Sequence, residues 1–280
     1  MSRSKRFHFA APWTVSPYVL WMGLFLLGPL VLIFVMSLQT KGAWGGVRYD
    51  WSGLAYKRLF DPVYGKVLWA SVKLAARTAV SCFLVGYPMA WYMSRLPHRE
   101  KRFAMLLVLL PLMSNFVARA YAVKFLVGAD GPVNRLLLSV GLISEPLFLD
   151  SPQLIIWIGM MTNYLPFFVL PLFVAIERFD YSLIEAARDL GASWWVVWWR
   201  VIWPMTRRAA YTGMILVFVP AMGEFIIPDL MGGGKTMFLG NLMTEQFLKT
   251  RDWPFGAAIC VFMMIAIVVV ALLVPRDRRV

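Results

Sequence analysis

The sequence predicts an all-α integral membrane protein with six transmembrane helices. Two observations carry this prediction. Of the 280 residues, 60% are apolar and only 15% are charged, whereas a soluble domain of this length usually has about 25% charged residues. The apolar residues also gather in blocks that would form helices of about 30 Å or more, which is enough to cross the hydrocarbon core. The six blocks are 17–38, 67–94, 103–127, 153–176, 209–231 and 255–274.

The distribution of Lys and Arg predicts which side of the membrane each connection faces. If the N-terminus is inside, the cytoplasmic connections carry 15 basic residues in 62 positions and the outer ones carry 9 in 76. Both termini are therefore expected in the cytoplasm, although the basic loop 39–66 opposes the trend. The first block is too long for a signal peptide and is expected to remain. The predicted organisation is a tail at 1–16, a membrane domain at 17–274 with a cytoplasmic loop at 177–208, and a tail at 275–280.

The remaining composition disfavours several classes of function. The net charge of +13 is spread between the apolar blocks, so the expected partner is the lipid bilayer and not nucleic acid. Cys82 and Cys260 lie inside apolar blocks, so no disulfide is expected. His8 and His98 fall in a tail and a loop, and no His, Cys or Asp cluster has metal-ligand spacing. The sequence therefore predicts no enzyme activity, no catalytic residue, no metal site and no cofactor on this chain.

The run MGGGKT at 231–236 has some features of a nucleotide-binding loop. That loop requires Gly, four residues and then Gly-Lys-Ser/Thr, and its first position here is Asp229. We therefore predict a turn outside the membrane. If transport uses ATP, hydrolysis takes place on another polypeptide.

The stretch EAARDLGASWWVVWWRVIWP at 185–204 interrupts the apolar pattern between blocks four and five. Around its start, apolar side chains recur at helical spacing, which predicts a short amphipathic helix over 181–190. Glu185 and Arg188 are placed to pair on the polar face of this helix. The predicted apolar face consists of Leu183, Ala187, Leu190 and Trp194.

The second half of the same stretch predicts a bend followed by an interfacial helix. Gly191 permits a sharp change of direction. Tryptophans and arginines at high density suit the headgroup layer, and Pro204 is expected to end this helix before the next span. The stretch is either a well-anchored loop or a helix offered to a groove on a cytoplasmic partner.

The spacing of this stretch resembles a known family signature. The membrane subunits of binding-protein-dependent ABC importers typically contain Glu-Ala-Ala, then three residues and Gly, and then nine residues before an Ile-x-Leu-Pro end. Val201 and Trp203 depart from the signature but remain apolar. The matching positions are Glu185, Ala186, Ala187, Gly191 and Pro204.

Other stretches resemble the spermidine/putrescine branch of that family, and most closely the first of its two permeases. The resemblance runs from about residue 17 to the end. Its stretches are AYKRLFDPVY (55–64), VGYPMAWYMSR (85–95), FVPAMGEFIIPDLMGG (218–233) and RDWPFGAA (251–258).

The resemblance implies a type I ABC importer permease architecture in a bacterial inner membrane. It also implies the partners: a second homologous permease, a dimer of ATP-binding subunits that holds ATP and Mg²⁺, and a periplasmic substrate-binding protein. On this interpretation, the helix around Glu185 inserts into a cleft on the ATPase. Polyamine import follows from the resemblance alone.

Charged residues inside the blocks are functional candidates, because a charge in the membrane is costly. Glu224 and Asp229 are candidates for attracting a cationic substrate near the outer mouth. The alternative is that these acids pair with Arg77 or Arg119 and hold helices together. The basic residues inside the blocks are Lys73, Arg77, Arg119 and Lys124.

Aromatic and proline residues complete the list of candidates. Tyr87, Trp91 and Tyr164 are candidates for cation–π contacts with the substrate. Prolines inside the blocks can break helices that line a cavity, so blocks four and five, with two each, are expected to be broken and to move; static kinks are the alternative. These prolines are Pro88, Pro111, Pro166, Pro171, Pro220 and Pro228.

Two rival classes of function stay open at this stage. An ion-coupled secondary transporter would need no ATPase, although no internal repeat of helices supports it. An intramembrane enzyme or assembly anchor would need a buried catalytic set, and none is visible. Within the ABC family, ferric iron or a small organic anion is the alternative substrate.

Overall fold

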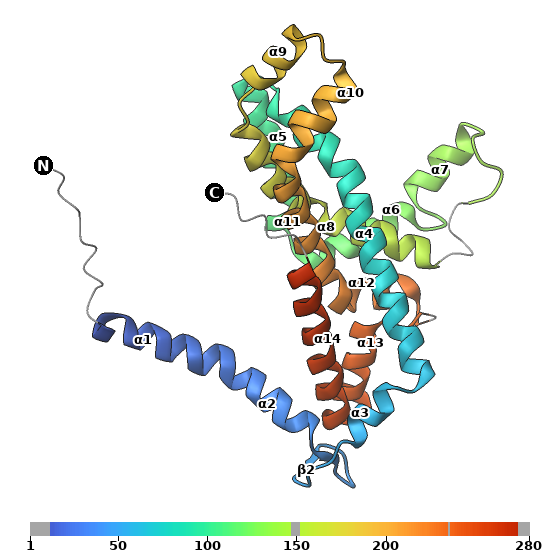
Figure 1. Ribbon diagram of the computed structural model, residues 1–280. Coiled ribbons are helices and arrows are strands. Elements are labelled where there is room, and N and C mark those ends of the chain that lie inside the picture. The colour runs from blue at the N-terminus through green and yellow to red at the C-terminus, as the bar shows by residue number, and fades with distance from the viewer. Residues whose placement is uncertain (1–11, 147–151, 235, 274–280) are drawn as a thin grey trace, which may run out of the picture. The chain divides into compact units, whose positions relative to one another are not determined.

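The computed structural model describes residues 12–146, 152–234 and 236–273, and these are mostly helical (Figure 1). The expected tails 1–16 and 275–280 therefore lie largely outside the described residues. The chain divides into two compact units, residues 1–61 with 245–266, and residues 62–244 with 267–280. Each unit is described by itself below.

The first unit contains an N-terminal apolar helix and a short hairpin. α1 (Pro12–Met22), the π-helical turn η1 (Gly23–Leu27) and α2 (Gly28–Ser37) follow one another directly. β1 (Thr40–Lys41) pairs antiparallel with β2 (Val47–Arg48). Gly45 and Gly46 have φ of 89° and 79° in the turn between them, a backbone conformation that glycine adopts without strain. The other elements are α3 (Leu54–Leu59), η3 (Glu245–Lys249) and most of α14 (Trp253–Leu273).

A buried carboxylate holds the first unit together. Arg58 Nη1 lies 2.8 Å from Asp252 Oδ2, and the side chain of Asp252 is only 6% exposed. The other oxygen of Asp252 accepts a hydrogen bond of 3.2 Å from the backbone N–H of Phe255, at the start of α14. The Arg58 guanidinium also lies 4.2 Å from the centre of the Phe255 ring. These contacts join α3 to α14.

The second unit is a helical bundle in which α4, α8 and α11 lie side by side (Figure 1). Phe168 of α8 is fully buried between Gly86 of α4 and Gly213 of α11. A Cβ at Gly86 would lie 2.6 Å from the Phe168 ring, and one at Gly213 would lie 2.9 Å from it. Small residues let membrane helices approach closely, and this aromatic ring fills the space they leave. The helices of this unit are α4 (Pro62–Ser94), α5 (His98–Met113), α6 (Phe116–Val127), α7 (Pro132–Ser139), α8 (Pro152–Glu177), α9 (Ser182–Asp189), α10 (Trp194–Val197), the π-turn η2 (Trp198–Ile202), α11 (Trp203–Gly223), α12 (Ile226–Gly232) and α13 (Leu239–Thr244).

Among the described residues, three helices are long and apolar enough to cross a membrane: Ser16–Ser37, α4 and α8. Two further spans result if bent helix pairs are each taken as one. α5 forms one pair with Phe116–Ser139, which contains α6 and α7, at a bend of 104°. The continuous helix Trp194–Gly223 forms the other pair with α12, at 63°. The described part of the sixth block is a shorter apolar helix, Trp253–Val269.

The helix breaks differ from those expected from the prolines. α8 runs unbroken through Pro166 and Pro171, so the expected break in block four is wrong. Each proline removes one backbone hydrogen bond, and the packing of α4 and α11 on either side keeps the helix intact. Block three is broken instead, between Met113 and Phe116, because Asn115 caps a new helix: its Oδ1 accepts the backbone N–H of Val117 at 2.9 Å.

Block five breaks after Pro220, as expected, at Glu224 and Phe225. The glycine run that follows is a turn, as predicted. Gly233 and Gly234 have φ of 58° and 74° and end α12, which is the usual role of glycine at a helix C-terminus.

We expect Gly240→Ala to destabilise the bundle by about 1–3 kcal/mol, the range for overpacking. A Cβ at Gly240 would lie 2.4 Å from the carbonyl oxygen of Gly223 and 2.7 Å from that of Glu224, and backbone atoms cannot rotate away. The midpoint of thermal unfolding of the purified protein measures the effect. Gly65→Ala is the control, since no heavy atom lies within 4 Å of its added Cβ. Equal midpoints for the two variants would show that the contact at Gly240 is relaxed.

Candidate functional site

The loop between α8 and α11 begins with a capped short helix. The Asp180 carboxylate accepts a hydrogen bond of 3.0 Å from the backbone N–H of Ser182, the first residue of α9. Hydrogen bonding by the Ser182 side chain, and then by its backbone N–H, lowers the pKa of the Asp180 carboxyl. A lowered pKa means that the cap is intact above the ordinary pKa of an aspartate and is lost as the pH falls through the lowered value.

A small hydrophobic core fixes the loop to the end of α4. Its buried members are Phe179, Ile184, Val197 and Ile202, and Tyr181 packs against them. The Tyr181 hydroxyl is hydrogen-bonded to Ser94 of α4 at 3.0 Å. An ion pair of 2.9 Å between Lys101 and Glu177 joins the same region to α5. The loop is therefore an ordered part of this unit.

The predicted apolar face of α9 is divided between the small core and the outer surface. Ile184 and Ala187 face the small core, because they lie one turn apart and follow Tyr181 along the same face. Leu183 and Leu190, which belong to the predicted apolar face, are 41% and 88% exposed. Together with the exposed Ala186, they form an outward apolar stripe at helical spacing.

The predicted ion pair between Glu185 and Arg188 is absent. Both side chains are exposed, and no oppositely charged group in the described part of the chain lies within ion-pair distance of either. Glu185 therefore adds a free negative charge beside the apolar stripe.

A bend at Gly191 leads into one long helix. Gly191 has a φ of 77°, and α10 begins three residues later at Trp194. The helix then continues through η2 and Pro204 to Gly223, so the expected separate interfacial helix ended by Pro204 is wrong. A proline ring collides with the preceding turn of a regular helix, and the π-helical turn Trp198–Ile202 directly before it widens the backbone at that point.

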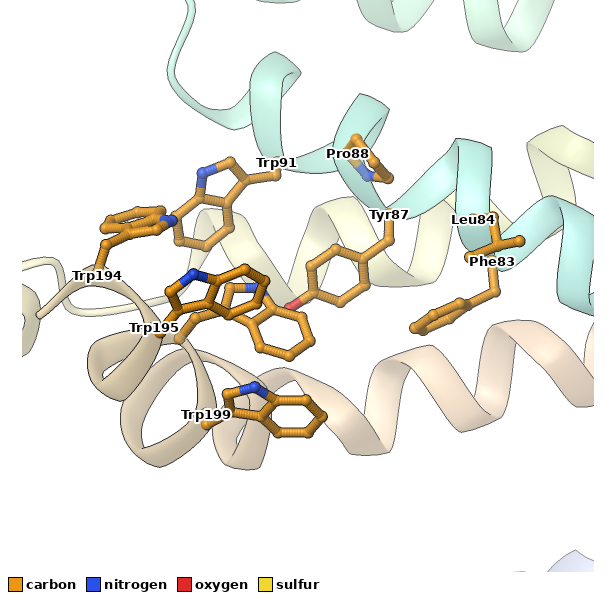
Figure 2. A pocket seen from close by; sticks show the side chains of 9 residues that line it. Phe83, Leu84, Tyr87, Pro88, Trp91, Trp194, Trp195 and Trp199 are labelled. Atoms are coloured by element: carbon orange, nitrogen blue, oxygen red, sulfur yellow. The ribbon is translucent and has the colours of Figure 1, made fainter.

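An aromatic pocket of about 490 Å³ lies between α4 and this helix (Figure 2). The hydroxyl of Tyr87 is hydrogen-bonded to Thr206 at 2.8 Å, so this tyrosine also ties the two helices together. One face of Trp91 already carries the guanidinium of Arg95, which lies 4.7 Å from the ring centre. The pocket is lined by Phe83, Leu84, Tyr87, Pro88, Trp91, Trp194, Trp195, Trp198 and Trp199.

The break between α11 and α12 places Glu224 in a second site. Tyr164 of α8 donates a hydrogen bond of 2.6 Å to Glu224 Oε2. Glu224 Oε1 accepts the backbone N–H of Ile226 at 2.9 Å, so the carboxylate also caps α12. Glu224 is half-buried, and no basic group of the described residues lies within ion-pair distance of it.

The helix pair α5 and α6 contacts α8 at Asn163, the residue before Tyr164. Arg119 Nε donates a hydrogen bond of 2.5 Å to Asn163 Oδ1, and its Nη1 donates to the carbonyl oxygen of Pro111. Asn163 is fully buried and donates to the carbonyl of Gly159 at 2.8 Å. Both broken helices are thus anchored at consecutive residues of α8, Asn163 and Tyr164.

The structure brings some of the predicted residues together and separates others. Glu224 and Tyr164 are in contact, while Tyr87 and Trp91 line the aromatic pocket. Asp229 is exposed on α12 and belongs to neither site. The suggested pairing of the acids with Arg77 or Arg119 is not observed, because Arg119 bonds to Asn163 and Arg77 lies over a tryptophan ring.

Sequence reasoning missed Asn163 and Thr206. A buried asparagine inside an apolar block is a signal that could have found the first, because amides in membrane spans form hydrogen bonds with partners. Among residues 12–146, 152–234 and 236–273, no group of three or more His, Cys, Asp or Glu side chains could hold a metal ion.

Comparison with known proteins identifies the family. Residues 79–277 match the family described as binding-protein-dependent transport system inner membrane component. The chain is 38% identical over 260 residues to the spermidine/putrescine transport system permease protein PotB of Escherichia coli (strain K12), covering 92% of this chain and 94% of that protein. It is 36% identical over 248 residues to PotB of Haemophilus influenzae, covering 89% and 87%.

A solved structure has the same fold. The crystal structure of a bacterial ABC transporter involved in the import of the acidic polysaccharide alginate matches with a TM-score of 0.69 and 17% identity, covering 93% of this chain and 92% of that one. This chain therefore belongs to the binding-protein-dependent transport system inner membrane components, and it is a permease subunit of an ABC importer, not an enzyme.

Proposed function

We propose that this chain is the first permease of a polyamine importer and forms half of the translocation path for spermidine or putrescine. Its partners are a second homologous permease, a dimer of ATP-binding subunits and a periplasmic substrate-binding protein. The identity of 38% to a spermidine/putrescine permease over nearly the whole chain supports the substrate class. ATP and Mg²⁺ bind to the partner ATPase, and this chain needs no cofactor.

The proposed membrane arrangement has six spans in a type I permease fold. They comprise the N-terminal helix, α4, the pair α5 and α6, α8, the pair of α11 with α12, and α14. The excess of basic residues in 1–16, 177–208 and 275–280 supports cytoplasmic termini in a bacterial inner membrane. Residues 17–274 then form one permease domain.

Coupling to the ATPase takes place at α9. The outward stripe of Leu183, Ala186 and Leu190, with the free charge of Glu185 beside it, suits a helix that enters a groove on a partner. Ala187 holds α9 to the small core, while Gly191 and Pro204 set the path of the chain into α11. When the ATPase subunits close on ATP, α9 moves with them, and the long helix Trp194–Gly223 tilts.

ATP binding shifts the permease to the outward-facing state only if it stabilises that state more than the inward-facing one. The tilt of the long helix acts on the break at Glu224, where α11 and α12 meet α8. The cavity is then open to substrate released by the binding protein.

Glu224 is the proposed contact for a cationic substrate. The single observation that supports this role is that the hydrogen-bond donors to its carboxylate are neutral. The carboxylate is held by a hydroxyl and a backbone N–H, both neutral donors, so its charge is positioned and not neutralised. A polyamine ammonium group supplies the missing cation. Tyr164 orients the carboxylate, Asp229 adds negative charge nearby on α12, and Tyr87 and Trp91 offer ring faces farther along the path.

Uptake by vesicles that contain all the subunits tests the proposal. ATP inside the vesicles and binding protein outside are expected to drive accumulation of spermidine or putrescine, each offered in turn. Accumulation of ferric iron or an organic anion in place of polyamines would overturn the substrate class. Uptake by this chain alone, driven by a proton or sodium gradient, would overturn the coupling to an ATPase.

A further inference from the structure

Lys73 and Arg77 of α4 lie beside the start of α8, although the sequence places them inside an apolar block. α4 has 33 residues and is therefore about 50 Å long, whereas the hydrocarbon core is about 30 Å thick. Both residues line a pocket with Gln153, which belongs to the first turn of α8. Since α8 is a span that begins at Pro152, the pocket lies at the level of the membrane surface.

Indole rings hold both cations in place. The Arg77 guanidinium lies 4.4 Å from the centre of the Trp157 ring, and Lys73 Nζ lies 6.0 Å from that of Trp69. Trp157 is itself fixed, because its Nε1 donates a hydrogen bond of 3.1 Å to Ser81. Tryptophans are typical of the interfacial layer of a membrane, which agrees with the position of α8.

The pocket has the chemistry of an anion site with an apolar wall. Its volume is about 250 Å³, and Lys73, Arg77 and Gln153 are among the residues that line it. Its described lining contains no carboxylate, and no acid of the described residues pairs with Lys73 or Arg77. Leu239 N–H donates a hydrogen bond of 2.7 Å to Ser71, which fixes the segment that carries Phe238. The lining is Ala70, Lys73, Leu74, Arg77, Gln153 and Phe238.

We propose that this pocket binds the phosphate of an anionic phospholipid. Lys73 and Arg77 contact the phosphate, Gln153 donates to the headgroup, and the apolar wall of Leu74 and Phe238 lies against the start of an acyl chain. Lys and Arg near a membrane surface attract anionic lipid headgroups. In the topology proposed above, the lipid belongs to the outer leaflet; the binding itself is independent of the transported solute.

Lipid titration of the purified importer tests this inference. Phosphatidylglycerol, phosphatidylcholine and inorganic phosphate are added separately, and binding is followed by the rise in thermal unfolding midpoint and by native mass spectrometry. We expect phosphatidylglycerol alone to bind. The double variant K73Q/R77Q is expected to lower its affinity about 30-fold, since each basic residue near an anionic lipid contributes a factor of about five.

A charge-matched control separates this site from general attraction. K66Q/R135Q removes the same charge from two exposed residues and is expected to bind phosphatidylglycerol as the unaltered protein does. An equal loss of phosphatidylglycerol affinity in both double variants, or no loss of affinity in K73Q/R77Q, would overturn the site. Equal binding of inorganic phosphate would overturn its assignment to a lipid.

Asp150 lies outside the described residues, so D150N forms a further arm of the experiment. If phosphatidylglycerol binds only to D150N, an internal carboxylate fills the pocket and the inference is wrong. Spermidine uptake by the same variants is measured in parallel in vesicles of phosphatidylcholine. A loss of uptake in both double variants would count against the transport proposal and not against the lipid site.

Discussion

Replacing Gly191 with proline is expected to leave ATP hydrolysis by the assembled importer running while solute transport falls. Gly191 has a φ of 77°, whereas proline fixes φ near −65°, so the chain cannot turn from α9 into α10 as it does here. Space is not the obstacle, because no heavy atom lies within 4 Å of an added Cβ. The amount of solute transported per ATP is expected to fall about tenfold or more, within the usual range of a coupling free energy.

Asparagine at the same position is the matched control, since it tolerates positive φ; Gly191→Asn is expected to transport nearly as the unaltered protein does. Glu185→Lys should reproduce the effect of the proline, because it reverses the charge beside the apolar stripe without changing the backbone. Normal coupling in both Gly191→Pro and Glu185→Lys would show that force enters the permease at another place.

The second large effect is expected at the helix break, where Glu224→Gln should reduce polyamine uptake about tenfold. The single oxygen of glutamine can still accept the N–H of Ile226 and keep the cap, while its amide NH2 can donate to the Tyr164 hydroxyl oxygen. Both contacts are then kept, one of them with its direction reversed, and the charge is lost. Initial uptake rates at several spermidine concentrations measure the change, which should appear in the apparent affinity.

Asp229→Asn removes the same charge from the exposed carboxylate on α12 and is expected to have a smaller effect. Tyr164→Phe keeps the charge of Glu224 but removes the group that orients it, so an intermediate loss is expected. If Glu224→Gln transports normally while Tyr164→Phe does not, the carboxylate serves the helix break and not the substrate.

The long apolar helices and the turn at Gly191 could be predicted because they leave strong local signals. Apolar blocks of 20 or more residues mark the spans, and Gly191 marks the turn, because few other residues adopt its backbone conformation. The face of α9 could not be predicted. Leu183 and Ile184 are equally apolar, and the choice between them depends on Phe179 and Val197, which only the fold brings beside the helix.

The helix breaks show a similar limit. Proline lowers the stability of a helix locally, but packing on both sides keeps α8 intact, while Asn115 starts a new helix in a block with a single proline. Within the candidate site, the acidic and aromatic residues were visible in the sequence. Their partners were not, because the contact between Tyr164 and Glu224 spans 60 positions and depends on how α8 packs against α11.

The unbroken helix from Trp194 to Gly223 has a mechanical consequence. Its thirty residues extend about 45 Å, and it packs tightly against α8 at Gly213, where an added Cβ would lie 2.9 Å from the Phe168 ring. If that contact is the fulcrum, the arm toward the ATPase is about 29 Å long and the arm toward Glu224 about 15 Å. A displacement of the inner end would then appear at the outer end reversed in direction and at about half the size, so a pull that draws the loop inward would swing the carboxylate the opposite way.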